Sequence, residues 1–535
     1  MNAEIEGRKK KTAVDILLLL CQIAVLLCVI ILVASTLLYA VVFNAEDGIV
    51  FTHTRWLPLG LGVLSLFLVT FALKKVHFKI NKIVFAVLLG LYTVINILIV
   101  CKLSLYPAND QFYMTYIATD MLQGEYKEFG YQGYMCLFPF QFGFVRYVWL
   151  IFKIFGQDNY IALQIINVLF LSGIIFFFVK STKYLFGEIK YIVGIALMCF
   201  APLTLYTTFI YGTIPSLFFS TVAIFFLLRL INKEKPVVLN IVIIVAADLL
   251  SVVLKTNAII ILIAQSMVLI LFAIKEKSRK GIIITIVSIV AIWGFNTVTT
   301  ELVNRDLYRY TYSDKIGTPK ITWVVMGLSD DSSVAEGWHN YYNRDVYWDN
   351  DCDQEVATEL SKEAIAGSLK RFADHPGYAA RFFWRKITSS WTNPSFEAIR
   401  NVDTSRKLNE NKEKDYDELT LRFFEKKEGC SLDESSPGIN GCLKIYEVAV
   451  IIGLLYYVIR KKITIYDSIY LIIFVGGFLF NLFWEAGCRY MLPYFAVIIP
   501  YGCVGFEQIA DRIILFLSGK KQAGKKRFGG IDEKD

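Results

Sequence analysis

The sequence has few charged residues and few histidines for its length. Only 19% of its 535 residues are charged, whereas 56% are hydrophobic and the mean hydropathy is +0.51. This composition excludes an ordinary soluble protein. The formal net charge of +8 is modest, so we expect no nucleic-acid partner. With four histidines and no paired Cys-x-x-Cys motif, a zinc site is not expected either.

The N-terminal segment lacks the small-residue cleavage site of a secretory signal peptide. Its basic start, MNAEIEGRKKKT, precedes an apolar run over 14–43 that is longer than an ordinary signal core. We therefore expect a membrane-spanning anchor. The chain also lacks convincing internal repeats, and its only low-complexity segment is the basic tail.

Twelve apolar segments are each long enough to cross a membrane. A helix of roughly 17 to 25 residues crosses the ~30 Å hydrocarbon core, at a rise of about 1.5 Å per residue. We therefore predict an α-helical polytopic membrane protein with about 12 transmembrane helices. The segments are 14–42, 56–74, 80–102, 160–180, 191–209, 213–231, 237–254, 257–274, 281–300, 444–460, 464–483 and 490–511.

Lysine and arginine collect in alternate turns between these segments, and the other short turns carry at most one cation each. Cytoplasmic turns of membrane proteins carry the excess of positive charge. We therefore expect both termini in the cytoplasm and the remaining turns on the external side of a plasma membrane. The basic turns are 74–79, 180–190, 229–235, 275–280 and 460–462, followed by the tail 512–535.

Two longer segments are expected on the external side. Residues 103–158 form a loop with juxtamembrane helices, and residues 301–443 are polar with helix-capping signals, which predicts an α-rich, mixed soluble domain. The apolar stretch 139–156 is assigned to the membrane surface, with Arg146 and Lys153 reaching water, because a crossing would move every later basic turn outside. The other parts, 1–102, 159–300 and 444–511, hold spans one to three, four to nine and ten to twelve.

Two cysteines of the external region bracket a turn-rich segment. Cys430 and Cys442 flank SLDESSPGING, which would let the two side chains meet. An external location is compatible with a disulfide, but the sequence leaves this pairing open.

The stretch YPANDQFYMTYIATDML places polar residues directly after the third predicted span. By spacing alone, Asn109 or Asp110 is a helix N-cap. Asp110 is also suited to act as a general base at the membrane surface, and the two roles are compatible. Asp120 is the less favoured carboxylate, because about 100° of rotation per residue turns it away from Asp110.

Further polar residues lie at predicted external helix ends. Lys255 and Asn257 occur in VLKTNA, where a cation either reaches the headgroups or binds a lipid phosphate. Glu485 and Arg489 occur in FWEAGCRYMLPY with a four-residue offset. If that segment is helical, they form a local ion pair or orient a guanidinium toward phosphate.

Aromatic residues accompany these groups. Tyr211 lies in a short turn between two spans. Trp338 and His339 suit sugar faces and hydroxyls, although the same composition is ordinary for membrane-interface anchors. Asp248 falls inside a predicted span, where it should face the bundle interior and have a partner.

Several motifs occur in a characteristic order. They are NDQ at 109–111, LFPFQFGFVRYVWLIFKIFG at 137–156, YGTIP at 211–215, LKTNA at 254–258, HPGYAARFFWRKITSSW at 375–391 and EAGCRYMLPY at 485–494. This order resembles the C-type superfamily of membrane glycosyltransferases, which includes protein O-mannosyltransferases and lipid A aminoarabinose transferases. The last motif is similar to a Glu-x-x-x-Arg-Tyr-x-x-Pro signature of bacterial members. The chain departs from the mannosyltransferases in having Gln111 after Asp110, where they have Glu, and two extra spans precede the first loop.

The resemblance implies inverting transfer of a sugar from a polyprenyl-phosphate donor to a hydroxyl of a glycan, lipid or protein acceptor, in contact with membrane lipid on the external face. Asp110 would be the base, and Lys255 and Arg489 would neutralise the leaving phosphate. No cofactor is required; a divalent metal is allowed but not expected. The supporting pocket would contain Asn109, Gln111, Tyr211, Asn257, Glu485 and Tyr490.

Two alternatives remain open from the sequence. A polytopic transporter or lipid-linked glycan flippase would share the hydropathy, although such proteins tend to have internal repeats and helices broken near the bilayer midplane. A polymerase or ligase of lipid-linked glycans would also work on the external side, with an assembled oligosaccharide as donor.

Overall fold

The computed structural model describes residues 12–76, 80–311, 316–410, 416 and 418–528. This part of the chain is helical apart from one two-stranded antiparallel sheet. The polytopic helical fold class is therefore confirmed. The sheet pairs β1 (Tyr39–Phe43) with β2 (Ile49–His53), with Val41 opposite Phe51.

Among the described residues, ten helices are long and apolar enough to cross a membrane, or up to 13 if each of three bent helix pairs is one span. The ten coincide with ten of the twelve predicted segments, so the chain is a multi-pass membrane protein. They are α1 (Ala13–Leu38), α2 (Trp56–Lys75), α3 (Lys82–Leu103), α7 (Tyr160–Phe186), α10 (Thr213–Ile231), α11 (Val237–Leu254), α12 (Ile259–Glu276), α13 (Arg279–Tyr308), α21 (Pro437–Arg460) and α22 (Ile465–Phe483).

The other two predicted spans are bent helix pairs. The first pair bends by 65° and the second by 58°. In each pair the second helix has a proline in its first turn, Pro202 or Pro500, which has no N–H to continue the preceding helix. The helices are α8 (Tyr191–Cys199), α9 (Ala201–Leu205) and η3 (Tyr206–Thr208), and then α23 (Cys488–Ala496) and α24 (Ile499–Phe528).

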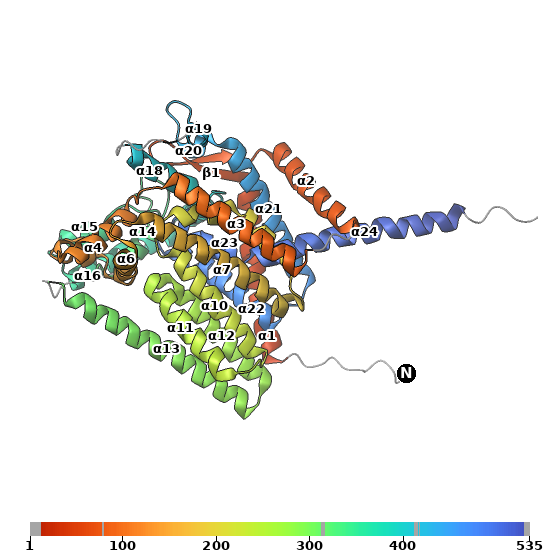
Figure 1. Ribbon diagram of the computed structural model, residues 1–535, viewed down its shortest axis with the longest axis horizontal. Helices are drawn as coiled ribbons and strands as arrows, with labels where there is room; N and C mark the ends of the chain where they lie inside the picture. The colour runs from red at the N-terminus through yellow and green to blue at the C-terminus, as the bar shows by residue number, and fades with distance from the viewer. Residues whose placement is uncertain (1–11, 77–79, 312–315, 411–415, 417, 529–535) are drawn as a thin grey trace, which may run out of the picture.

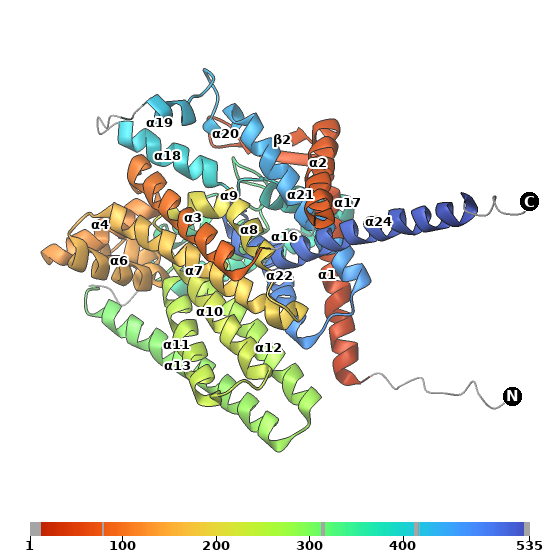
Figure 2. The ribbon, with the colours of Figure 1, turned by 45° about the vertical axis from the view of Figure 1, so that its right-hand side comes forward.

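The third bent pair contains the segment assigned to the membrane surface. Its two arms meet at 98° and comprise η1 (Lys127–Phe129), α5 (Tyr134–Leu137), η2 (Pro139–Gln141) and α6 (Phe142–Phe155). Helix α6 lies beside α4 (Asp110–Gln123) (Figures 1 and 2).

Arg146 of α6 is partly exposed and also has an ionic partner that was not expected. Its Nε donates to Asp306 Oδ2 over 2.6 Å, and its guanidinium lies 5.0 Å from the Trp149 ring centroid. Helix α13 extends to Tyr308, beyond the predicted end at 300, and so brings Asp306 to this position. Lys153 is exposed, and its Nζ lies 4.9 Å from the centroid of the same Trp149 ring.

Helices α14 to α20 form a layer over one end of the bundle, with α18 to α20 near α3 and the hairpin (Figures 1 and 2). One apolar cluster joins Leu103 of α3 to Ile399, Val402, Phe424 and Leu432. The region therefore shares its core with the ends of the spanning helices. Its helices are α14 (Ile321–Gly327), α15 (Tyr342–Trp348), α16 (Gln354–Asp374), α17 (Pro376–Trp391), α18 (Ala398–Glu410), α19 (Glu418–Phe423) and α20 (Leu432–Ser435); the remaining short element is η4 (Thr256–Ala258).

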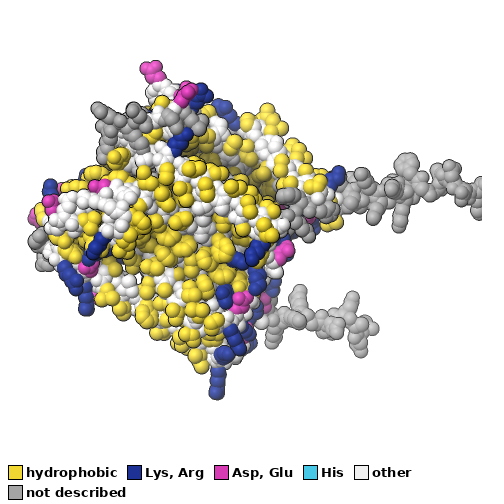
Figure 3. Space-filling model, viewed as in Figure 1, with side chains coloured by type: hydrophobic (Ala, Val, Ile, Leu, Met, Phe, Trp, Pro, Cys, Tyr) yellow, Lys and Arg dark blue, Asp and Glu magenta, His cyan; other side chains and the backbone are white. Residues whose placement is uncertain are grey.

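Hydrophobic side chains cover the middle of the molecular surface, and lysine and arginine gather toward its ends (Figure 3). Leu57, Ile83, Leu98 and Val290 are each more than half exposed. An apolar surface of this extent is expected where helices face lipid.

The cysteine pairing that the sequence left open is not formed. Cys430 and Cys442 are both free, the first partly buried and the second exposed. The turn-rich segment between them instead forms α20 and the start of α21.

Candidate functional site

Asp110 begins α4 with its carboxylate available to other segments. Asn109 is the N-cap residue, but its side chain accepts no capping hydrogen bond, and its φ is +52°. Asp110 Oδ2 lies 4.0 Å from Arg489 Nη2, and the Asp110 side chain is 38% exposed. Asn109 thus occupies the expected N-cap position without a capping hydrogen bond from its side chain. The Asp110 carboxylate faces Arg489 of the distant α23.

Gln111 ties α4 to the turn before α10. Its buried Oε1 accepts a 2.7 Å hydrogen bond from the backbone N–H of Ile210. The next residue, Tyr211, accepts a 2.6 Å hydrogen bond from Gln141 Nε2. Burial and nearby Asp110 raise the pKa of Tyr211 to about 12, so its hydroxyl stays protonated at neutral pH. Gln111 therefore fixes the position of the Tyr211 turn.

Lys255 follows the last residue of α11 in extended conformation. Its Nζ donates to Thr213 Oγ1 over 2.7 Å and lies 5.2 Å from the Tyr211 ring centroid. No carboxylate among the described residues forms an ion pair with it. Desolvation and the nearby Arg489 guanidinium lower the pKa of Lys255 to about 7. An arriving anion would hold the ammonium in its charged form.

The turns that carry Tyr211 and Lys255 are in close backbone contact. A Cβ on Gly212 would lie 2.0 Å from the carbonyl oxygen of Leu254, so no larger residue fits there. Asn257, on η4, is half-buried, and its side chain forms no hydrogen bond within the described structure.

Glu485 and Arg489 do not form the expected pair on one helical face. Helix α23 begins only at Cys488, after extended Gly487, so Glu485 lies outside it. Tyr490 connects them: Arg489 Nη2 donates to its hydroxyl over 3.3 Å, and that hydroxyl donates to Glu485 Oε1 over 3.4 Å. Burial raises the pKa of Glu485 to about 7.

His339 reaches the same group of side chains, whereas Trp338 does not. His339 Nδ1 lies 3.7 Å from Glu485 Oε1, and its side chain is 39% exposed. Burial and Arg489 lower the pKa of His339. Trp338 is only 4% exposed, and its Nε1 donates to Ser389 Oγ over 2.9 Å. Trp338 is therefore a packing residue and presents no ring face to a ligand.

Two further carboxylates lie away from this group. Asp120 is buried farther along α4, and burial raises its pKa. Asp248 is fully buried between α11 and α12 and accepts a 2.8 Å hydrogen bond from Gln265 Nε2. The expectation that Asp248 has an interior partner is confirmed.

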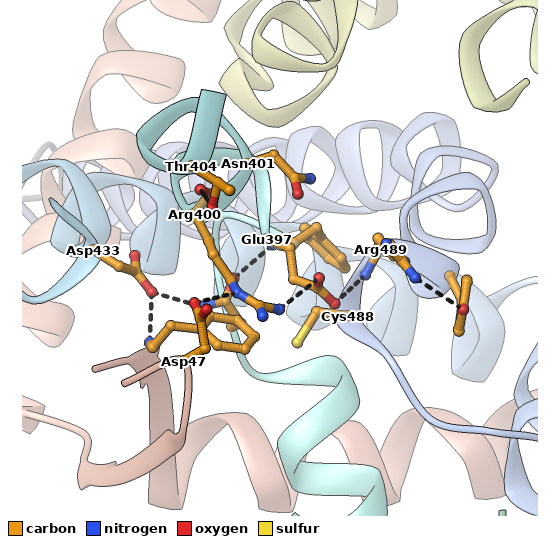
Figure 4. A network of polar contacts seen from close by, with 12 residues as sticks. Asp47, Glu397, Arg400, Asn401, Thr404, Asp433, Cys488 and Arg489 are labelled. Carbon is orange, nitrogen blue, oxygen red and sulfur yellow. Dashed lines mark hydrogen bonds and ion pairs between the residues drawn. The ribbon is translucent and has the colours of Figure 1, made fainter. Parts of the chain in front are cut away.

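Glu397 is a site residue that no pattern in the sequence indicated. It is 2% exposed and has a positive φ of +65°. Its Oε1 accepts the backbone N–H of Arg489 over 3.1 Å, and its Oε2 lies 3.4 Å from Arg400 Nη1. Arg400 in turn pairs with Asp47 at 3.0 Å. Figure 4 shows Arg489 and Arg400 on opposite sides of the Glu397 carboxylate.

Lys386 is a second residue near the site that no pattern in the sequence indicated. Its Nζ donates to the carbonyl oxygens of Gly327, Leu482 and Trp484, the last over 2.8 Å. These bonds hold the chain directly before Glu485. Burial lowers the pKa of Lys386 to about 7. The motif HPGYAARFFWRKITSSW contains Lys386, but its sequence does not indicate these backbone acceptors.

The structure thus brings together Asp110, Tyr211, Lys255, His339, Glu485, Arg489 and Tyr490 at one end of the bundle. Within the described residues, no group of three His, Cys, Asp or Glu side chains is arranged to hold a metal ion. Comparisons of the chain with protein-family models, with curated proteins and with solved structures gave no match.

Proposed function

We propose that this protein is an inverting membrane glycosyltransferase that moves a sugar from a polyprenyl-phosphate donor to an acceptor hydroxyl. The observation that carries the proposal is the 4.0 Å approach of the partly exposed Asp110 carboxylate to Arg489, beside Lys255. A base and two cations from three distant segments match a reaction that removes a proton and releases a phosphate.

In the proposed reaction, Asp110 takes the proton of the acceptor hydroxyl while the hydroxyl oxygen attacks the anomeric carbon of the donor sugar. The bond between that carbon and the phosphate oxygen breaks, and its electrons leave with the polyprenyl phosphate. Lys255 and Arg489 stabilise this anion where its charge develops. Glu485 and Tyr490 orient the guanidinium through the hydrogen bonds described above.

The proposal includes an orientation. Both termini would be cytoplasmic, and the site would face the exterior of a plasma membrane, as the distribution of basic turns indicates. The acceptor would be a glycan, lipid or protein of the cell envelope. The resemblance of the late motif to bacterial glycosyltransferases supports a bacterial membrane.

The test is sugar transfer by purified protein from synthetic polyprenyl-phosphate monosaccharides. Asp110→Asn removes the base and should lower the rate by a factor of about 10² to 10⁴. Asp120→Asn, on the same helix, is the matched control and should retain the wild-type rate. Full activity of Asp110→Asn would show that another group is the base.

A transporter or flippase is the second candidate, because two observations favour it. The pairs α8–α9 and α23–α24 are broken helices, and Asp248 is an ionisable residue inside a predicted span. Proteoliposomes separate the candidates: movement of a lipid-linked sugar across the bilayer without transfer to any acceptor would favour this alternative. Transfer only from an assembled oligosaccharide donor would indicate a polymerase or ligase.

A further inference from the structure

Asp248 and Gln265 form a polar pair inside the helix bundle. Asp248 belongs to α11, against which α10 and α13 pack, and it lies about 9 Å along the helix axis from the last residue of α11 (Figures 1 and 2). Gln265 belongs to α12, and both side chains are 0% exposed. The buried residues Ile244, Ile261 and Leu269 lie one helical turn away from the pair. A charge without a partner is unfavourable in such surroundings.

The pair has one hydrogen bond and two oxygens that lack a donor. Gln265 Nε2 donates to Asp248 Oδ1 over 2.8 Å. Asp248 Oδ2 and Gln265 Oε1 are both buried and accept no hydrogen bond from the described residues. Within that part of the chain Asp248 also forms no ion pair. An ionised Asp248 would therefore hold an uncompensated charge and would leave the Gln265 oxygen unsatisfied as well.

The hydroxyl groups farther along the same face of α11 are already engaged. Ser251, three residues after Asp248, contacts the Ser220 hydroxyl over 2.6 Å and the Ser216 hydroxyl over 3.0 Å. Lys255, four residues farther on, donates to a threonine of α10. These bonds join α10 to α11 and supply no donor to Asp248 Oδ2.

A single proton would satisfy both oxygens. On Asp248 Oδ2 it removes the negative charge and turns that oxygen into a donor, and Gln265 Oε1 is an acceptor on the amide group that already binds Oδ1. A carboxylic acid and an amide can form two hydrogen bonds side by side, whereas a carboxylate and an amide form one. We infer that Asp248 is a proton-binding site, in which Oδ2–H donates to Gln265 Oε1 and water supplies the proton.

A metal ion fits this pair less well than a proton. A hard cation such as Ca²⁺ takes about six to eight oxygen ligands. Asp248 and Gln265 offer three side-chain oxygens, one of which already accepts a hydrogen bond. A neutral Asp248 also explains how an aspartate is accommodated in α11, which is apolar enough to cross a membrane.

Infrared spectroscopy of the full chain at neutral pH tests this assignment and needs no substrate, so its result is independent of the proposed sugar transfer. The C=O stretch of a protonated carboxylic acid lies at a higher frequency than the bands of carboxylates and amides. Asp248→Asn should remove one carboxylic-acid band per chain. Asp467→Asn is the matched control: the buried Asp467 of α22 accepts hydrogen bonds at both carboxylate oxygens, so this variant should leave the acid bands unchanged.

Thermal unfolding in detergent gives a second measurement. Asp248→Asn keeps a donor and an acceptor for Gln265 and should keep the wild-type unfolding temperature. Asp248→Leu removes both hydrogen bonds and should lower that temperature by about 2–5 °C. If Asp248→Leu does not fold, the infrared comparison still decides.

Three results would each overturn the assignment. The first is a wild-type spectrum from which Asp248→Asn removes no acid band. The second is equal destabilisation by Asp248→Asn and Asp248→Leu. The third is an unfolding temperature that Na⁺ or Ca²⁺ raises in the wild type but not in Asp248→Asn, which would show that a metal ion occupies the pair.

Discussion

Lys255 and Lys444 both lie near ends of spanning helices, yet their surroundings differ. Lys444, on α21, is 5% exposed, pairs with Glu447 at 3.1 Å and donates to the carbonyl oxygen of Thr392. Lys255 is half-buried and has only the Thr213 hydroxyl and the Tyr211 ring. A buried charge within the membrane needs a partner of opposite charge. The difference indicates that Lys444 is structural; under the proposed function, the anion that Lys255 lacks would be the phosphate of the donor.

The largest expected effect comes from removing Lys444, the cation of the buried ion pair with Glu447. Lys444→Met leaves Glu447 buried without its cation and should cost about 3–5 kcal/mol of stability. Thermal unfolding in detergent measures the loss, and the transfer rate well below the unfolding temperature should stay within about twofold of wild type. The double change Lys444→Met with Glu447→Gln should recover part of the stability. A large loss of activity without loss of stability would show that Lys444 acts in the proposed active site. Lys444 and Lys255 would then not differ in role.

The next effect concerns Lys255, the cation that has no carboxylate partner. Lys255→Met should reduce transfer from a polyprenyl-phosphate sugar by a factor of about 10² to 10³, because one stabiliser of the leaving phosphate is lost. Thermal stability should change little, since no carboxylate loses a partner. Lys255→Arg is the matched variant and should retain more activity. A strongly destabilised Lys255→Met protein with a normal rate would show that Lys255 is structural, like Lys444.

A smaller effect is expected from Glu397, which contacts Arg489 through the backbone. Glu397→Ala removes the acceptor of the Arg489 N–H and should lower kcat/KM for the donor about tenfold. Glu397→Gln keeps an acceptor oxygen and should recover most of this loss, which a general weakening of the fold would not predict. Equal defects in both variants at unchanged stability would argue against positioning through that hydrogen bond.

The spans and the cations of the site could be predicted from local sequence properties. Ten spans follow from apolar runs, and the grouping of Asp110, Lys255 and Arg489 follows from the alternation of basic turns. Each of these signals lies within a single segment. Local signals did not indicate the ionic partner of Arg146, because the length of α13 brings Asp306 to it.

Glu397 and Lys386 could not be predicted, because their partners are distant in the sequence. Glu397 and Arg489 are 92 residues apart, and Lys386 and Trp484 are 98 apart. Only the tertiary fold brings such groups together. The pair Glu485 and Arg489 failed for the opposite reason: the spacing was suitable, but Gly487 is extended and the helix starts after it.

The smallest effect is a pH dependence of phosphate binding at Lys255. Because its pKa is about 7, far below the usual value for lysine, the ammonium is lost as pH rises through 7. Between pH 7 and 8, the affinity of the free protein for polyprenyl phosphate should therefore fall about fivefold, as measured by calorimetry. Glu485, with a pKa of about 7, gains negative charge over the same range and acts in the same direction, whereas His339 is held mostly neutral.

Two variants separate these groups. Lys255→Arg keeps its charge at every pH tested and should flatten most of the dependence, since a guanidinium does not titrate there. Glu485→Gln should leave the part due to Lys255 in place. If Lys255→Arg shows the full fivefold fall and Glu485→Gln abolishes it, the carboxyl group of Glu485 controls the site. Lys255 would then stay charged between pH 7 and 8. It would differ from Lys444 only in having no carboxylate partner.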